Sequence, residues 1–160
     1  IGGKMDYHTD PIEELNRYYA VWQETNHIYE EWAKRHGISA CCLLMLISID
    51  EGGKQCTQKN ISQRWSIPKQ TVNMILKDLQ NKKYVELIPV QEDKRNKQIQ
   101  FTASGKEYAD TILSELRKAE LTVVEKMGME RIHRLNEESE LFIKLFRETG
   151  GSPAYEDTNP

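Results

Sequence analysis

The chain has 160 residues, of which 38% are hydrophobic and 29% are charged, and its formal net charge is −3. This length and composition predict a buried core within one domain and exclude an intrinsically disordered protein. No apolar run approaches the roughly 20 residues of a membrane-spanning helix, and no signal peptide is recognisable. Three cysteines, two of them adjacent, do not form a secreted disulfide framework. The sequence therefore predicts a cytoplasmic protein without a membrane partner.

Both ends of the chain lack the periodicity of a helix or a strand. Ile1–Lys4, which precede Met5, are interpreted as residues left from cloning, and residues 1–10 as a flexible N-terminus. Residues 148–160 contain Gly, Pro and acidic residues, which predicts a mobile tail. One folded domain is expected over residues 11–147.

A long helix is predicted from Pro11 to about Gly37. Asp10 suits an N-cap followed by proline at the first helical position, and Gly37 follows three basic residues that favour a helix end. One face of this helix carries Ile12, Leu15, Tyr19, Trp22, Asn26, Tyr29 and Ala33. A stripe of this length needs a long partner. The sequence favours a second copy of the same chain, with packing inside one subunit as the alternative.

Three shorter helices are predicted next. Residues 39–49 form an apolar core helix that ends at a Gly-Gly pair. Thr57 is the expected N-cap of the next helix, and after a tight turn a third one starts at Pro68. The inward face of this third helix is apolar, with Val72, Ile75, Leu76 and Leu79. Its outward face comprises Lys69, Gln70, Asn73, Met74, Lys77 and Asn81.

The hydrophobic period then changes from 3.6 to 2. Val85, Leu87, Ile99 and Phe101 alternate with polar residues, which predicts two strands joined by a charged loop. Two helices follow, one opening with Thr-Ala-Ser-Gly at residues 102–105 and running to about Met127, the other following Gly128. The predicted fold class is mainly α with a small β-hairpin wing. A winged helix-turn-helix core over 54–105 is flanked by helices over 11–37 and 106–147.

The net charge hides an asymmetry along the chain. Between Lys54 and Lys97 ten cations face four anions, a net charge of +6, so the remainder carries −9. Three of these cations lie in the five residues Asp93–Lys97, within the hairpin. A basic block in an acidic chain predicts a polyanionic partner on one face.

Two motifs stand in the basic region: Asp-Lys-Arg at 93–95 and Thr-x-x-Gly at 102–105. With them, the segment Thr57–Asp110 resembles the DNA-binding core of MarR-family transcriptional regulators, and the resemblance extends over roughly residues 11–147. It implies a homodimer, formed by the flanking helices, that acts as a repressor on a pseudo-palindromic operator. The two recognition helices of such a dimer lie in successive major grooves, about 34–36 Å apart.

Two surfaces are expected to contact double-stranded DNA. Polar side chains on the recognition helix can meet base edges in a major groove, and Met74 can contact a thymine methyl group. On the wing, Arg95 is expected to enter a narrow minor groove and Asn96 to assist, while the resemblance implies that Asp93 holds the arginine. The candidate residues are Lys69, Gln70, Thr71, Asn73, Met74, Lys77, Lys94, Arg95, Asn96 and Lys97. The alternative is a solvated helix face beside an ordinary hairpin turn.

The resemblance also implies a small aromatic or amphipathic effector, bound between the dimerisation helices and the winged domain. Residues that could line such a site are Tyr18, Trp22, Tyr29, Trp32 and Met45. An aromatic stripe is more often part of a core, and that interpretation stays open for each of them.

Redox sensing, protein interaction and catalysis have weaker signals in the sequence. Cys41 and Cys42 stand at a helix start, where a thiol pKa can fall, so a thiol-based redox-sensing regulator is one alternative and buried packing the other. The protein could also be an interaction module that keeps the winged fold without binding DNA. No enzyme, cofactor or metal site is expected, because nucleotide and hydrolase motifs are missing from the sequence. The four histidines lack paired ligand spacing: His8, His27, His36 and His133.

Overall fold

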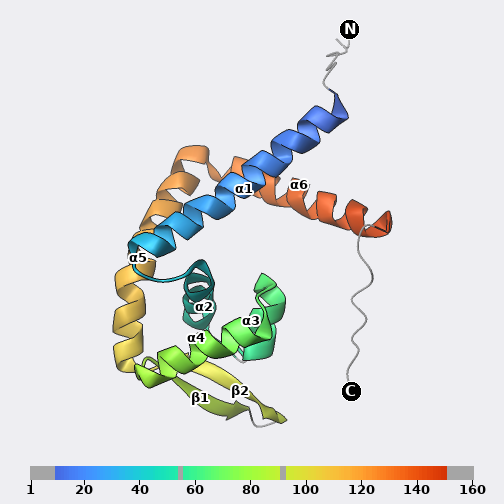
Figure 1. The fold of residues 1–160 in the computed structure, drawn as a ribbon. Coiled ribbons are helices and arrows are strands. Elements are labelled where there is room, and N and C mark those ends of the chain that lie inside the picture. Colours follow the sequence, from blue (N-terminus) through green and yellow to red (C-terminus); the bar gives the residue numbers. More distant parts are fainter. Residues whose placement is uncertain (1–9, 54–55, 91–92, 151–160) are drawn as a thin grey trace. The chain divides into compact units, whose positions relative to one another are not determined.

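The computed structural model describes residues 10–53, 56–90 and 93–150, and the side chains of 90–96 lie outside this description. The described helices and strands are α1 (Pro11–Arg35), α2 (Ala40–Glu51), α3 (Gln58–Trp65), α4 (Lys69–Asn81), β1 (Val85–Val90), β2 (Asp93–Phe101), α5 (Ala103–Met127) and α6 (Met129–Glu148) (Figure 1). The predicted fold class, mainly α with a β-hairpin wing, is confirmed. The expected flexible N-terminus with His8, and most of the expected tail, lie outside the described residues.

The chain divides into two compact units, which meet between Leu113 and Ser114 inside α5. The first unit holds α1 to α4, the hairpin and the start of α5, and the second holds the rest of α5 and α6. The single domain expected over residues 11–147 stays a prediction. No described helix combines the length and the apolar character that crossing a bilayer would require.

Helix ends in the first unit follow from capping residues. The Asp10 carboxylate accepts a hydrogen bond from the Ile12 amide at 3.0 Å, and Pro11 begins α1. The Ser39 hydroxyl accepts from the Cys42 amide at 3.1 Å and caps α2. Gly52 ends α2 with a φ of +68°, a conformation that glycine adopts at little cost. The predicted boundaries of both helices are therefore close to the observed ones.

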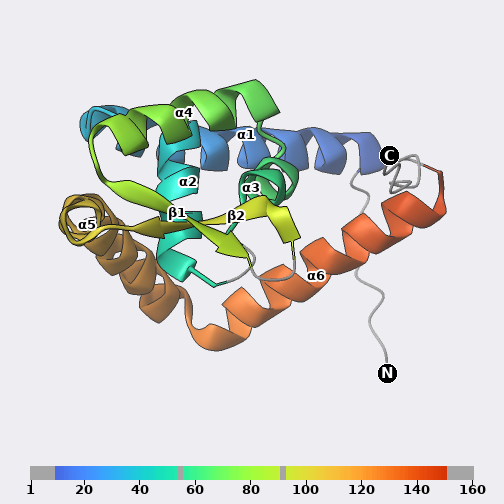
Figure 2. The same ribbon diagram turned by 90° about the horizontal axis from the view of Figure 1, so that it is seen from below.

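The core of the first unit gathers around α2. Its sequence is apolar on every side, and it packs against α1, α3, α4 and β2 (Figures 1 and 2). The largest fully buried side chains come from α2, α4 and β2: Leu43, Met45, Leu46, Val72, Leu76, Leu79 and Ile99. The inward stripe predicted for α4 thus belongs to this core.

A tight turn joins α3 to α4. Ser66 adopts the left-handed conformation, with a φ of +52°, and ends α3. The Ile67 amide donates to the Ser62 carbonyl at 3.1 Å, while the Ser62 hydroxyl donates to the Ile67 carbonyl at 2.7 Å. Ile67 itself is buried. These contacts fix the direction in which α4 leaves α3, which gives the two helices the form of a helix-turn-helix.

The wing is an antiparallel hairpin attached at its base to the helix-turn-helix. Leu87 pairs with Ile99, and the register shifts between Pro89 and Val90. The residues before α3 add a third short stretch of pairing, because the Ile99 amide donates to the Cys56 carbonyl at 2.8 Å. The base of β2 is therefore held against the start of α3.

The Thr-x-x-Gly motif joins the end of α4, the end of β2 and the start of α5. The Thr102 hydroxyl donates to the Lys83 carbonyl at 2.7 Å and accepts from the Gly105 amide at 3.0 Å. A Cβ atom on Gly105 would lie 1.7 Å from the Tyr84 carbonyl oxygen, so no other residue fits without moving the backbone. Lys83 has a φ of +59°, an uncommon conformation for a residue with a side chain. The motif is thus a structural clamp, named here the Thr102 clamp.

In the second unit, Gly128 separates α5 from α6 with a φ of +82°. The α6 helix has no buried residue, although its sequence is amphipathic. The Phe142 and Phe146 rings stack with centroids 6.1 Å apart. The exposed large apolar residues of this unit are Leu121, Val123, Met127, Met129, Leu135, Leu141, Phe142, Ile143, Leu145 and Phe146. The apolar residues of α6 therefore face solvent.

Candidate nucleic-acid interface

The outward face of α4 is a continuous polar surface. The inward side chains anchor the helix, since Val72 is 0% exposed and Leu76 1%. On the opposite side Met74 is 65% exposed, and Thr71 is half-buried. The other predicted members of this face are exposed as well: Lys69, Gln70, Asn73, Lys77 and Asn81. One side of α4 therefore maintains the core while the other is available to a partner.

The N-terminus of α4 adds positive potential to this face. Pro68 is the N-cap, and its side chain provides no hydrogen bond to the first turn of the helix. Backbone amides at a helix start carry a partial positive charge and favour anions such as phosphate. Lys69 stands in the same turn, and neither Lys69 nor Lys77 forms an ion pair within the described part of the chain.

Other cations of the basic segment are neutralised inside the chain. The Lys82 ammonium lies 2.7 Å from the Asp78 carboxylate, one turn earlier in α4. The Arg64 guanidinium forms an ion pair with Glu51, a contact that sequence reasoning missed. Because these residues are thirteen positions apart and belong to different helices, no local pattern could have revealed the pair. The count of ten cations in the basic segment thus overstates the number that a partner could use.

The wing differs in one respect from the expected charged loop. Residues 93–97 belong to β2, because the strands still pair at Val90 and Asp93, so the hairpin turn is shorter than predicted. Lys97 lies opposite Pro89 and is exposed. The side chains of Asp93, Lys94, Arg95 and Asn96 lie outside the described part, and their expected roles stay predictions. What the backbone shows is a strand that carries these residues away from the core.

The five residues proposed to line an effector site occupy different environments. Met45 is 0% exposed and belongs to the core of the first unit. Tyr18 and Trp22 lie on α1 and are 46% and 59% exposed. Tyr29 and Trp32 are half-buried nearer the end of the same helix. Of the five residues, Tyr29 and Trp32 are therefore the two that are half-buried.

Trp32 is the most informative of these residues. Its ring stacks on His36 with centroids 5.0 Å apart, and the Arg35 guanidinium lies 5.3 Å from the ring centroid. Its indole N–H is buried, and in the described part of the chain it finds no acceptor. Most buried donors have a partner, so this N–H distinguishes Trp32 from the other four residues.

Cys42 and Cys56 do not have the properties of reactive thiols. Burial raises the pKa of the Cys42 thiol from its usual 9.0 to about 11, and the nearby Lys82 offsets only part of this effect. Burial and the Glu51 carboxylate likewise raise the pKa of Cys56 to about 11. A lowered pKa at the helix start is therefore not found for Cys42, because burial raises the pKa of this thiol.

The described histidines form contacts that are common on helix surfaces. The His27 ring lies 3.5 Å from the Glu31 carboxylate, and the His133 ring lies 3.1 Å from that of Glu137. The His36 Nδ1 atom lies 2.9 Å from the Trp32 carbonyl oxygen, at the end of α1. Over residues 10–53, 56–90 and 93–150, no three His, Cys, Asp or Glu side chains gather as metal ligands would.

Comparison with protein families gives a match to the MarR family over residues 36–96, which include α2, α3, α4 and most of the wing. The HTH-type transcriptional regulator SarZ of Staphylococcus haemolyticus is 29% identical over 87 residues, 54% of this chain and 58% of its own length. SarZ of Staphylococcus epidermidis is 26% identical over 102 residues, 64% of this chain and 68% of its own length. The chain thus spans less than two thirds of the first of these relatives.

Solved structures extend the similarity beyond the winged segment. A MarR family regulator from Neisseria meningitidis has a TM-score of 0.71 at 21% identity, covering 89% of this chain and 98% of that one. The Staphylococcus aureus MarR in complex with salicylate and kanamycin has a TM-score of 0.60 at 25% identity, with 82% and 91% covered. The S. aureus MepR–DNA complex has a TM-score of 0.63 at 20% identity, with 79% and 96% covered.

Proposed function

We propose that this chain, which matches the MarR family over residues 36–96 and has a winged helix-turn-helix fold, is a transcriptional regulator that binds duplex DNA. The observation that carries this proposal is the outward face of α4. Its base-reading side chains are exposed, its inward side chains are buried, and its N-cap, Pro68, provides no side-chain hydrogen bond. A B-DNA major groove admits such a helix and presents donors and acceptors that Gln70, Asn73 and Lys69 can meet. The wing extends the same basic surface toward an adjacent minor groove.

The proposed assembly is a homodimer. The apolar stripes of α1 and α6 are exposed, as Trp22, Leu135 and Phe146 illustrate. Exposed apolar surface of this extent marks an interaction site in a soluble protein. A second copy of the chain would cover it and present two α4 helices to one side of the duplex. A dimer of this kind binds half-sites about 34–36 Å apart and excludes other proteins from that DNA, which is the basis for proposing a repressor.

An effector is proposed to act near Trp32. The buried indole N–H of this residue has no acceptor in the described part of the chain, and the stacked aromatic and cationic groups around it suit a small aromatic or amphipathic molecule. A ligand that binds one arrangement of the dimer better than another shifts the equilibrium between them. The salicylate named for the S. aureus MarR structure is a molecule of this chemical kind.

The test of DNA binding is selection of bound duplexes from a random pool, using purified protein. The expected result is a palindromic consensus whose half-sites are one helical turn apart. Affinity for the selected duplex should fall steeply between about 50 and 200 mM salt, because phosphate contacts release counterions. Failure to enrich any duplex would favour the protein-interaction alternative.

Variants of the proposed interface separate positioning from base recognition. The double change Lys69→Ala with Arg95→Ala should weaken binding to all duplexes and reduce the salt dependence. Gln70→Ala and Asn73→Ala should instead change which base is preferred, at a cost of about 1–3 kcal/mol each. Lys126→Ala, on α5, is the matched control and should leave affinity unchanged. Intact affinity in the double variant would show that the binding face is assigned wrongly.

A further inference from the structure

We propose that Arg64 is a positioning residue for DNA binding, which fixes the helix-turn-helix to the last turns of α2 through Glu51 and Trp65. The proposal rests on the DNA-binding function proposed above. It concerns the polar cluster formed by Ser48 and Glu51 of α2 with Arg64 and Trp65 of α3, named here the α2–α3 cluster.

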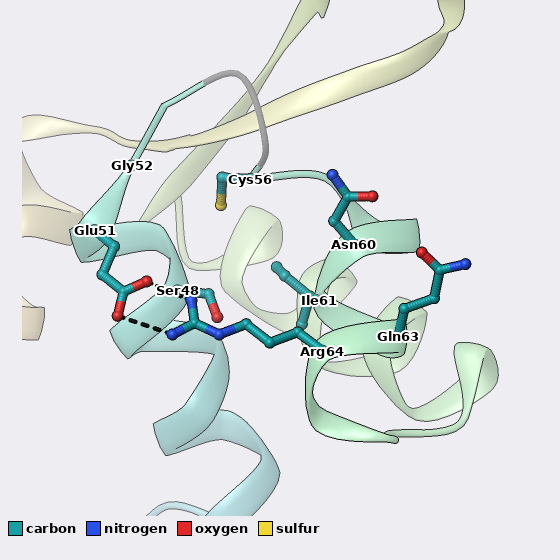
Figure 3. A pocket seen from close by; sticks show the side chains of 8 residues that line it. All are labelled: Ser48, Glu51, Gly52, Cys56, Asn60, Ile61, Gln63 and Arg64. Atoms are coloured by element: carbon teal, nitrogen blue, oxygen red, sulfur yellow. Dashed lines mark hydrogen bonds and ion pairs between the residues drawn. The ribbon is translucent and has the colours of Figure 1, made fainter. Parts of the chain in front are cut away.

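The first contact of the α2–α3 cluster is a bidentate ion pair. Arg64 Nη2 donates to Glu51 Oε1 at 3.1 Å, and Arg64 Nη1 donates to Glu51 Oε2 (Figure 3). Two parallel N–H···O bonds define the orientation of both side chains, which a single contact cannot do. The last turn of α2 is therefore joined to α3 with a defined geometry.

The second contact runs through Trp65. The Arg64 guanidinium carbon lies 4.6 Å from the centroid of the Trp65 ring, which holds the planar cation in place. The indole N–H of Trp65 donates to the Ser48 hydroxyl at 2.7 Å, and this hydroxyl donates to the Leu44 carbonyl at 3.0 Å. Ser48 is buried, so its hydroxyl bonds within the protein. The α2 and α3 helices are thus connected at two points, one turn apart.

The cluster lies beside an open pocket at one end of the two helices. A pocket of about 290 Å³ opens between them, and Figure 3 shows it from close by. It is lined by Ser48, Glu51, Gly52, Cys56, Asn60, Ile61, Gln63 and Arg64. Ile61 is buried and anchors the inner side of α3, whereas the pocket beside it leaves the polar contacts to orient the outer side of this helix. The α2–α3 cluster therefore sets the position of α3 at this end.

The position of α3 is passed on to the recognition helix. The Ser62 hydroxyl donates to the Ile67 carbonyl and the Ser62 carbonyl accepts from the Ile67 amide, and these two bonds make the intervening turn stiff, so α4 follows α3 as one body. A displacement of even 1 Å at a recognition helix misplaces several base contacts at once, because hydrogen bonds tolerate little change in distance and angle. Loosening the cluster should therefore reduce DNA affinity without touching a residue of the α4 face.

Effects on folding and on binding can be separated here. The Arg64 and Glu51 side chains are 49% and 46% exposed, and ion pairs with such exposure stabilise a folded protein by only about 0–1 kcal/mol. Variants of this pair should therefore stay folded. A direct contact between Arg64 and a DNA phosphate is the competing explanation for any loss caused by removing the arginine, and Glu51→Gln distinguishes the two. Freeing Arg64 from its carboxylate would strengthen a direct phosphate contact but would weaken binding through positioning.

The experiment measures affinity for the selected duplex over a range of salt concentrations, with a melting curve for each variant. Arg64→Met and Glu51→Gln should each weaken binding about 5- to 10-fold. For Glu51→Gln the slope of log affinity against log salt should stay unchanged, because no phosphate contact is lost. The exchange variant, Glu51→Arg with Arg64→Glu, should recover part of the lost affinity, since the ion pair is re-formed with opposite polarity while the cation over the Trp65 ring is lost.

Glu130→Gln is the matched control. Glu130 pairs with Arg134 at 2.8 Å on α6, and the same carboxylate-to-amide change there should leave DNA affinity unaltered. Equal or tighter binding by Glu51→Gln would overturn the positioning role, and so would an exchange variant that folds but binds as weakly as the single variants. If the original protein enriches no duplex, the proposed function itself fails; if it binds and Glu51→Gln binds equally well, only the positioning role fails.

Discussion

The α4 and α6 helices carry the same kind of amphipathic sequence but use it differently. In α4 the apolar side chains are buried within their own unit, and Leu76 is 1% exposed. In α6 no residue is buried, and Leu135 and Phe146 are 55% and 51% exposed. A stripe at three-four spacing shows that a helix has an apolar face, but it does not show which chain covers that face. The α4 helix belongs to a unit with its own core, whereas the apolar face of α6 is exposed, which is why a partner is proposed for it.

The largest expected effect concerns the apolar face of α6. Phe146→Glu should convert the proposed dimer to monomer in sedimentation equilibrium. Burial of one phenylalanine contributes about 1.5–3 kcal/mol, and twofold symmetry doubles the loss to about 3–6 kcal/mol. The control is Lys144→Glu, which changes an exposed residue of the same helix to the same acid. Equal association of both variants would remove the contrast between α4 and α6.

The next largest effect tests how much the Thr102 clamp stabilises the first unit. Gly105→Ala places a methyl group where the Tyr84 carbonyl oxygen lies 1.7 Å away, so the start of α5 must shift. The free energy of unfolding should fall by about 4 kcal/mol, or the protein should fail to fold. Ser104→Ala, in the same turn, loses one hydrogen bond to the Lys83 carbonyl and should cost about 0.5–1.5 kcal/mol. Denaturant titration measures both, and an unchanged midpoint for Gly105→Ala would contradict the clamp.

A pair of substitutions in α4 separates its two faces. Leu76→Ala should destabilise the protein by about 2–5 kcal/mol, because it opens a cavity in the core. Met74→Ala should change stability by less than about 0.5 kcal/mol, since this side chain is 65% exposed. Binding to the selected duplex should show the reverse order, with the Met74 variant losing discrimination at a thymine. Equal stability losses would show that α4 does not have two separate faces.

The next prediction concerns the reactivity of the Cys42 thiol at neutral pH. With Cys41 and Cys56 replaced by serine, iodoacetamide should modify Cys42 about a hundredfold more slowly in the folded protein than in urea. The reason is a thiol pKa of about 11 in place of 9.0, which lowers the thiolate fraction by that factor. Rapid modification of the folded protein would revive the redox alternative.

The same thiol sets a pH window for stability. Below about pH 9 Cys42 is protonated in both the folded and the unfolded chain, and the contribution of its raised pKa is fully present. Between about pH 9 and 11 the unfolded chain releases the proton and the folded chain keeps it, so stability falls as the pH rises. A Cys42→Ser variant should lose less stability across this window.

Much of the fold could be predicted from local signals. Asp10, Ser39 and Thr57 stand where helices begin, and each bonds to the first turn that follows it. The inward stripe of α4 and the alternation of the two strands depend only on periodicity, which a single sequence records directly. The helix order and the winged helix-turn-helix followed from these local rules.

The unpredicted features all depend on contacts between distant residues. The pairing of Glu51 with Arg64 and of Ser48 with Trp65 joins helices that the sequence separates by a glycine-containing loop. Ser66 and Lys83 adopt the left-handed conformation without being glycine, so no residue preference marks them. The direction of the Cys42 pKa shift likewise depends on burial, which the sequence does not specify. Local sequence signals therefore predict the helices and strands, whereas the contacts and pKa values of individual side chains depend on tertiary packing.

The separation of the inward and outward faces of α4 has a consequence for how the sequence of this helix can change. The α4 helix is attached to the rest of its unit by the inward stripe, the Ser66 turn and the Thr102 clamp. None of these contacts uses an outward side chain of α4. New side chains at Gln70, Asn73 or Met74 can therefore arise with little penalty in folding. A lineage built on this scaffold could acquire a new operator through a few substitutions, and an engineer could retarget it by randomising the same positions.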